Sequence, residues 1–246
     1  MQRTIIAAMT KSKTKKHILE DEAIPEQIII NSIVAAVSEQ RLPAGTKLGE
    51  QMLSDLFQCN RANVRRALST LATMHVVQLQ PNRGAFISTP SPKEAEDVFS
   101  ARRIIERTLA SQVIINATTQ DMVDMRAIIK AEAEARAQGN KPAELRLSRE
   151  FHMHLATIAD NQVLEKFLSE LTLRTTLIIG LYNEVGSSNC AEDEHLSIVQ
   201  AIEAKDETLL IALVDEHLRH LESGLNFKST TKSLFDLAEQ LVISPS

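Results

Sequence analysis

The sequence predicts a mostly α-helical protein, with an N-terminal winged helix-turn-helix and a C-terminal all-α bundle of six or seven helices. Apolar residues recur every three or four positions through most of the chain, which is the period of an amphipathic helix. Only 7 Gly and 7 Pro interrupt 246 residues, so long helices are rarely broken. The β-prone runs are confined to one short region, on either side of the turn-forming residues 81–84.

The N-terminal part is expected to contain three helices followed by a β-hairpin. An amphipathic helix begins at Pro25 and runs to about Gln40, and a short helix follows at 49–57. Asn60 is a good N-cap for a third helix, whose apolar residues fall on one face. The Pro-Asn-Arg-Gly segment that ends at Gly84 then predicts the hairpin turn.

The C-terminal part shows no strand signal and is expected to be helical throughout. The predicted helices are 93–117, 119–138, 143–160, 161–185, 191–204, 206–226 and a weaker one at 230–243. The predicted domains are a flexible basic and polar arm at 1–24, a winged helix-turn-helix at 25–90, a helical effector-binding and dimerisation domain at 91–228 and a C-terminal helix or tail at 229–246.

Charge and cysteine usage narrow the class of protein. Residues 1–90 carry a net charge of +4, whereas residues 91–246 carry −9, which indicates different partners for the two parts. Cys59 and Cys190 form no paired motif, so we expect a reducing compartment without disulfides. The apolar run at 177–182 is too short to span a bilayer and no signal peptide is recognisable, so we expect a cytoplasmic protein without membrane contact.

The third helix is the candidate for contact with double-stranded DNA. Arg61 lies in its first turn, where the helix dipole and free backbone N–H groups favour phosphate. Arginine also matches the O6/N7 edge of guanine in the major groove. The arm at 1–24 either touches DNA or has no role. The residues predicted to read DNA from this helix, its neighbour and the hairpin tip are Gln51, Asn60, Arg61, Asn63, Arg65, Arg66, Arg83 and Gly84.

The stretch PAGTKLGEQMLSDLFQCNRANVRRALSTLATMHVVQLQPNRGAFIS resembles the DNA-binding domain of GntR-family bacterial transcription regulators. The resemblance implies that Arg61 and Arg65 contact operator DNA and that Gly84 lies at the tip of the wing. Three positions depart from the family pattern. Asn60 replaces the usual Ser, Arg66 replaces a common Glu, and Gln51 stands where some members have a DNA-contacting Arg. These changes concern which operator is bound rather than whether DNA is bound.

The C-terminal part resembles the ligand-binding (FCD) domain of the FadR-type branch of that family. The segments ARRIIERTLASQVI, FHMHLATIADNQVLEKFLSEL and DEHLSIVQAIEAKDETLLIALVDEHL match its pattern. The resemblance implies a homodimer and a small-molecule effector, often an organic acid. Many members of the branch bind a divalent metal with three histidines and an Asp one helical turn before the first.

Three histidines are candidates for such a site. His152, His195 and His217 each fall on the apolar stripe of a separate helix, so we expect all three to point into one bundle interior. Ser148 occupies the position of the Asp, and a serine hydroxyl is a poor ligand for zinc. Two alternatives remain open: a weakened three-histidine site for Zn, Ni or Mn, or a pocket of polar imidazoles without metal. Cys190 is a less favoured substitute ligand.

Other polar residues of the bundle allow further assignments. His154 and His220 fall off the apolar stripes and are predicted to lie on the surface. Arg102 interrupts an apolar stripe with Glu106 one turn later, so it either forms a structural ion pair or binds an effector carboxylate. Arg174 is a second anion candidate. The predicted effector-binding residues are Arg102, Ser148, His152, Arg174, His195 and His217.

These features together predict a ligand-responsive, sequence-specific transcription regulator that acts as a dimer on a pseudo-palindromic operator. Repression of catabolic genes is the expected mode, with an organic acid or nitrogenous metabolite as effector. One alternative is a three-histidine metal-dependent hydrolase with Glu194 as its general base. Another is a structural protein that binds DNA without sequence preference.

Overall fold

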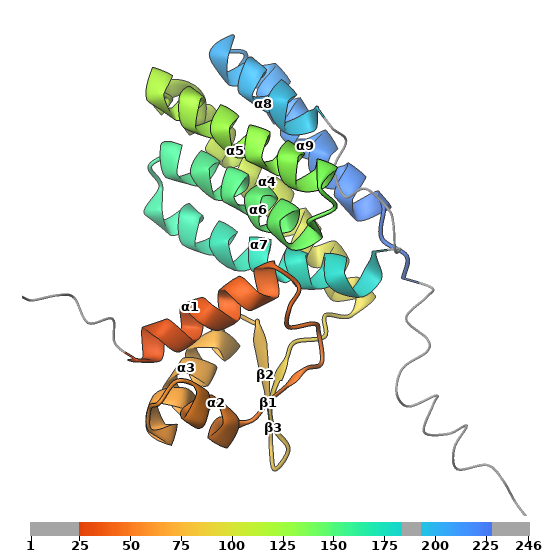
Figure 1. Ribbon diagram of the computed structural model, residues 1–246. Helices are drawn as coiled ribbons and strands as arrows, with labels where there is room; N and C mark the ends of the chain where they lie inside the picture. The colour runs from red at the N-terminus through yellow and green to blue at the C-terminus, as the bar shows by residue number, and fades with distance from the viewer. Residues whose placement is uncertain (1–24, 184–192, 228–246) are drawn as a thin grey trace, which may run out of the picture.

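The computed structural model describes residues 25–183 and 193–227 and contains a small N-terminal domain packed under a helical bundle (Figure 1). The N-terminal domain consists of α1 (Pro25–Ser38), β1 (Lys47–Leu48), α2 (Glu50–Leu56), α3 (Arg61–Thr73), β2 (Val77–Gln80) and β3 (Gly84–Ile87). The bundle consists of α4 (Pro92–Asn116), α5 (Thr119–Ala137), α6 (Lys141–Ile158), α7 (Gln162–Tyr182), α8 (Glu194–Glu203) and α9 (Glu207–Ser223).

The predicted helices agree with the structure within three residues at each end. The arm at 1–24 and the weak helix at 230–243 lie outside the described residues. Beyond Pro92 the described ranges contain helices and their connections, and the one β-type pairing in these ranges is an isolated bridge between Asn183 and Leu225. None of the helices in these ranges is long and apolar enough to cross a membrane.

The N-terminal domain has the winged helix-turn-helix arrangement. Strands β2 and β3 form the predicted hairpin, and Gly84 at its tip has φ of +101°, a conformation that glycine adopts without strain. The sequence analysis missed β1, which pairs with β3 to give the sheet order β1-β3-β2. Strand β1 has only two residues, too few for an alternating pattern to be recognised.

Asn60 fixes the start of α3. Its side chain accepts a hydrogen bond from the backbone N–H of Asn63 at 2.9 Å, which satisfies one of the free donors of the first turn. The apolar face of α3 packs into the N-terminal domain, so the opposite face remains exposed to solvent. The buried residues of α3 are Val64, Ala67, Leu68 and Leu71.

The two domains share α7. Leu173 and Leu177, from the middle of α7, belong to the hydrophobic cluster of the N-terminal domain. Helix α1 lies against α7 in Figure 1 and packs on its other side against α3. The buried hydroxyl of Tyr182 donates a hydrogen bond of 2.8 Å to the carbonyl of Pro90, in the segment that joins the domains.

We expect Asn60→Ala to lower the free energy of unfolding by about 1 kcal/mol, because the N-cap hydrogen bond is lost. Asn60→Ser is the matched control, since serine is a comparably good cap, and it should unfold like the wild type. Urea unfolding followed by circular dichroism measures both. Equal destabilisation by both substitutions would contradict a capping role.

Candidate functional sites

The exposed face of α3 is basic. Arg61, Arg65 and Arg66 are all exposed, and Arg65 keeps 64% of its side-chain surface accessible. At the tip of the wing, the guanidinium of Arg83 lies 5.6 Å from the centre of the Phe86 ring. A capped helix with arginines on one face, beside a basic hairpin, is suited to contact phosphates and base edges.

Each arginine of α3 has a partner on the protein. Arg65 Nε donates to Glu50 Oε2 at 2.8 Å, and Arg66 Nε donates to Glu26 Oε2 at 3.0 Å. Arg61 Nε donates to Gln51 Oε1 at 2.8 Å. Exposed pairs of this kind contribute little to stability, so phosphates can replace the partners at low cost.

The structure brings the three predicted histidines together in the bundle interior. His152, His195 and His217 are almost fully buried, and their ligand nitrogens all lie within 4.8 Å of one another. They come from α6, α8 and α9. The ring of His195 stacks on Phe151, with 4.1 Å between centroids, which fixes its orientation.

A carboxylate orients each of the three rings. His152 Nδ1 lies 2.8 Å from Glu106 Oε2, His195 Nδ1 lies 2.7 Å from Glu132 Oε2, and His217 Nδ1 lies 2.8 Å from Glu194 Oε2. A carboxylate is a hydrogen-bond acceptor, so each Nδ1 is the protonated nitrogen. The second nitrogen of each ring, Nε2, then presents its lone pair.

The residues fit a divalent metal ion. Nε2 of His152 and Nε2 of His217 are 3.1 Å apart, and a cation bound by both nitrogens would remove the repulsion between their lone pairs. Carboxylates on the outer ring nitrogens are also the usual second partners of metal-binding histidines. One of these carboxylates, on Glu132, lines the same cavity as Ser148 and brings negative charge close to the position where Ser148 provides none.

Burial keeps two of the rings neutral. Desolvation lowers the pKa of His152 to about 4 and that of His217 to about 3, even though the adjacent carboxylates oppose the shift. Burial alone would raise the pKa of Glu106, but Arg102 and His152 outweigh it and lower this pKa to about 2. At neutral pH His152 and His217 are therefore neutral, beside the ionised carboxylate of Glu106.

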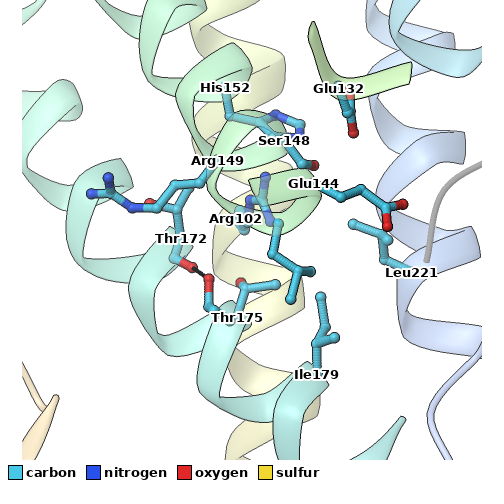
Figure 2. A pocket seen from close by; sticks show the side chains of 12 residues that line it. Arg102, Glu132, Glu144, Ser148, Arg149, His152, Thr172, Thr175, Ile179 and Leu221 are labelled. Carbon is cyan, nitrogen blue, oxygen red and sulfur yellow. Dashed lines mark hydrogen bonds between the residues drawn. The ribbon is translucent and has the colours of Figure 1, made fainter. Parts of the chain in front are cut away.

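A small cavity of about 30 Å³, room for about two water molecules, lies beside His152 (Figure 2). Arg102 lines it together with Ser148, from the turn of α6 before His152. Arg102 Nε donates to Glu106 Oε1 at 2.6 Å, which is the predicted ion pair, but its Nη2 has no hydrogen-bond partner among the described residues. The remaining lining residues are Glu132, Glu144, Leu145, Arg149, His152, Thr172, Thr175, Thr176, Ile179 and Leu221.

An anion in this cavity would be favourable. The Arg102 side chain is only 4% exposed, and an unsatisfied buried guanidinium N–H is costly. Arg149 adds a second cation to the lining, and burial followed by the charge of Arg102 lowers its pKa. A carboxylate would satisfy Nη2 of Arg102 and offset the positive charge of Arg149.

Arg174 and His154 do not lie where the sequence analysis predicted them. Arg174 does not line the cavity; its Nη2 donates to Glu94 Oε1 at 2.6 Å, near the junction of the domains. His154 was expected on the surface, but its side chain is only 25% exposed and lies 3.9 Å from Asp121. His220 is on the surface as predicted, and Cys190 lies outside the described residues.

The sequence analysis missed Glu132 as the partner of His195. Glu132 lies seven residues after the buried Met125 on α5, so both share the inner face of that helix. That spacing was the available signal. The pairing itself needed the tertiary structure, because Glu132 and His195 are 63 positions apart.

The depressed pKa values predict acid sensitivity of the metal-free protein. His152 and His217 take up protons near pH 6.5 when unfolded but only near pH 4 and pH 3 when folded. The stability they contribute is therefore present above pH 6.5 and is lost as pH falls. Two protons taken up on unfolding give a slope of up to about 2.7 kcal/mol per pH unit.

Urea unfolding in the presence of a chelator, between about pH 7 and pH 5, measures this slope. His217→Gln removes one of the two titrating rings. The part of the pH slope of the unfolding free energy that comes from these histidines should therefore fall by about half. The same pH dependence in both proteins would contradict the assignment of buried neutral rings.

Comparison with known proteins identifies the two domains. The family model "Bacterial regulatory proteins, gntR family" matches residues 25–87, and the model "FCD domain" matches residues 97–220, half of the chain. The HTH-type transcriptional regulator LutR of Bacillus subtilis is 24% identical over 212 residues, covering 77% of this chain and 96% of LutR. The HTH-type transcriptional repressor RspR of Escherichia coli is 22% identical over 182 residues, covering 74% of this chain and 80% of RspR.

Solved structures show the same fold. E. coli McbR/YncC aligns with a TM-score of 0.71 at 14% identity, covering 89% of this chain and 99% of that one. A putative transcriptional regulator GntR from Rhodococcus sp. RHA1 also aligns with a TM-score of 0.71, at 15% identity, covering 80% of this chain and 95% of that one. The basic α3 face, the polar cavity and the two matched models lead to one conclusion. The chain belongs to the GntR family of bacterial regulatory proteins and is a ligand-responsive, DNA-binding transcription regulator with an FCD domain.

Proposed function

We propose that this regulator is a homodimeric repressor that releases its operator when a small carboxylate binds beside a metal ion in the bundle. The observation that carries the effector class is that the buried Nη2 of Arg102 faces the cavity and has no hydrogen-bond partner within residues 25–183 and 193–227. Repression is in keeping with the name of the E. coli relative RspR, a transcriptional repressor. The expected targets are catabolic genes, for which the effector is a substrate or an intermediate.

The DNA contacts are assigned to α3 and the wing. In a dimer, two copies of α3 enter successive major grooves of a pseudo-palindromic site. Arg61 and Arg65 read base edges or phosphates from the start of the helix, and Gly84 allows the wing backbone to approach the minor groove. The remaining contacts are assigned to Gln51, Asn60, Asn63, Arg66 and Arg83.

His152, His195 and His217 would hold a divalent cation such as Zn, Ni or Mn through Nε2. When bound, the cation supplies a Lewis acid that binds a carboxylate oxygen strongly. Three protein ligands leave a coordination position for water or effector, and Ser148 provides no carboxylate to fill it. If no metal is bound, the same imidazoles would instead line a pocket for a nitrogenous metabolite.

An enzymatic function is not favoured by the surroundings of the histidines. A hydrolase would need a general base free to act on a bound water. Glu194 was the candidate, but its carboxylate lies against both His217 and His220 and so serves to hold these rings. The second alternative, DNA binding without sequence preference, is separated from regulation by the DNA experiment below.

Metal titration tests the metal assignment. The wild type should bind about one equivalent of Zn²⁺ per chain, measured by competition with a chromogenic chelator. His217→Ala should weaken binding by 100-fold or more, since loss of even an outer-shell partner costs roughly 10- to 100-fold. Ser148→Asp should strengthen it. His154→Ala, on α6 but outside the cluster, is the control, and binding by His217→Ala as tight as the wild type would overturn the assignment.

Binding to DNA selected from a random pool by the wild-type protein tests the α3 assignment. Arg65→Ala should weaken binding to the selected duplex by between about 10- and 100-fold, the value of one good arginine–base contact. Arg126→Ala, an exposed arginine of the bundle, should bind like the wild type. Fluorescence anisotropy at fixed salt gives both values. Selection of no common sequence would favour non-specific binding instead.

A further inference from the structure

Helix α7 has two faces with different surroundings. Thr172, Thr175, Thr176 and Ile179 line the cavity. Leu173 and Leu177 point the other way and belong to the hydrophobic cluster of the N-terminal domain, which also contains the apolar faces of α1 and α3. One helix therefore forms both a wall of the cavity and part of the core under the DNA-reading helix.

On the cavity face of α7, the threonine hydroxyls donate hydrogen bonds to carbonyl groups of the same helix. Thr175 Oγ1 donates to the carbonyl of Leu171 at 2.8 Å, and Thr176 Oγ1 donates to the carbonyl of Thr172 at 3.1 Å, which is the dashed line in Figure 2. Thr172 Oγ1 donates to the carbonyl of Ser169 at 3.0 Å. Such bonds from a side chain back to its own helix weaken and bend the helix slightly. The curvature of α7 therefore depends on where these hydroxyls point.

The other face of α7 is in contact with the N-terminal domain and with the connection between the domains. A Cβ atom added at Gly180 would lie 3.0 Å from the side-chain amide of Gln40, just after α1. Arg174 pairs with Glu94 at the start of α4, and Tyr182 bonds to Pro90 in the connecting segment. Helix α7 thus contacts the N-terminal domain and the connection between the domains at several points along its length.

We propose that α7 couples the cavity to the DNA-binding domain through its threonine hydroxyls. The proposal rests on the proposed function, because it assigns to that effector site its means of regulation. A carboxylate in the cavity accepts hydrogen bonds from the threonines, which then leave the carbonyls of α7. The cavity is also small, so a ligand larger than a few atoms displaces this wall. Either change alters the curvature of α7 and moves α1, and with it α3.

Hydrogen–deuterium exchange of the full-length protein without metal or effector tests the coupling. Thr175→Val removes the hydroxyl at nearly constant volume, and Thr175→Ser keeps the hydroxyl. We expect Thr175→Val to change amide exchange in α1 and α3 by about 2- to 30-fold, the range of coupling through packed elements. Thr175→Ser should restore the wild-type rates.

Thr108→Val is the matched control. Thr108 Oγ1 makes the same kind of bond, to the carbonyl of Ile104 at 2.8 Å, but Thr108 is exposed on α4 and does not line the cavity. This variant should leave exchange in α1 unchanged. If amide exchange in α1 and α3 of Thr175→Val is the same as in the wild type, the proposal is overturned, whether or not exchange in α7 itself has changed.

A second variant approaches α7 from its other face, in case Thr175→Val does not fold. Gly180→Ala should change exchange in α6, across the cavity, by a similar factor, because coupling between two sites is reciprocal. Unchanged exchange in α6 overturns the proposal as well. Neither variant needs a ligand, so failure of the coupling is distinguishable from a failure to bind metal or operator.

Discussion

The burial of three imidazoles in one helical bundle is the constraint on which the rest of the C-terminal domain depends. A buried imidazole without a partner is costly, so each ring has to be placed beside an acceptor. The acceptors are the carboxylates of Glu106, Glu132 and Glu194, which lie on α4, α5 and α8, while the histidines lie on α6, α8 and α9. The resulting network joins five helices and directs three nitrogens to one point.

Helix α7 supplies the link between this network and the rest of the molecule. Its threonines form the cavity wall beside Arg102, while Leu173 and Leu177 complete the core of the N-terminal domain. A hydrophobic core shared in this way cannot be disturbed on one side without an effect on the other, because close-packed interiors transmit strain. The two domains are therefore mechanically connected by more than the segment between β3 and α4.

The exposed basic face of α3 is held together in a different way. Arg61, Arg65 and Arg66 make only exposed contacts to neighbouring side chains, which hold them in place weakly and can be exchanged for phosphates. The separation of charge along the chain acts in the same direction, since the acidic bundle is repelled by DNA while the basic N-terminal part is attracted. Affinity for DNA is thus concentrated at one end of the molecule.

The sequence by itself determined the helices, the hairpin and the inward direction of the three histidines, because apolar periodicity, the Asn60 cap and the turn at Gly84 are local signals. It also determined the basic face of α3. Only the tertiary structure decided which groups meet. The pairing of Glu132 with His195, the position of Arg174 away from the cavity and the two-sided packing of α7 all depend on contacts between residues distant in sequence. Local periodicity says which face of a helix is buried but not which helix lies against it.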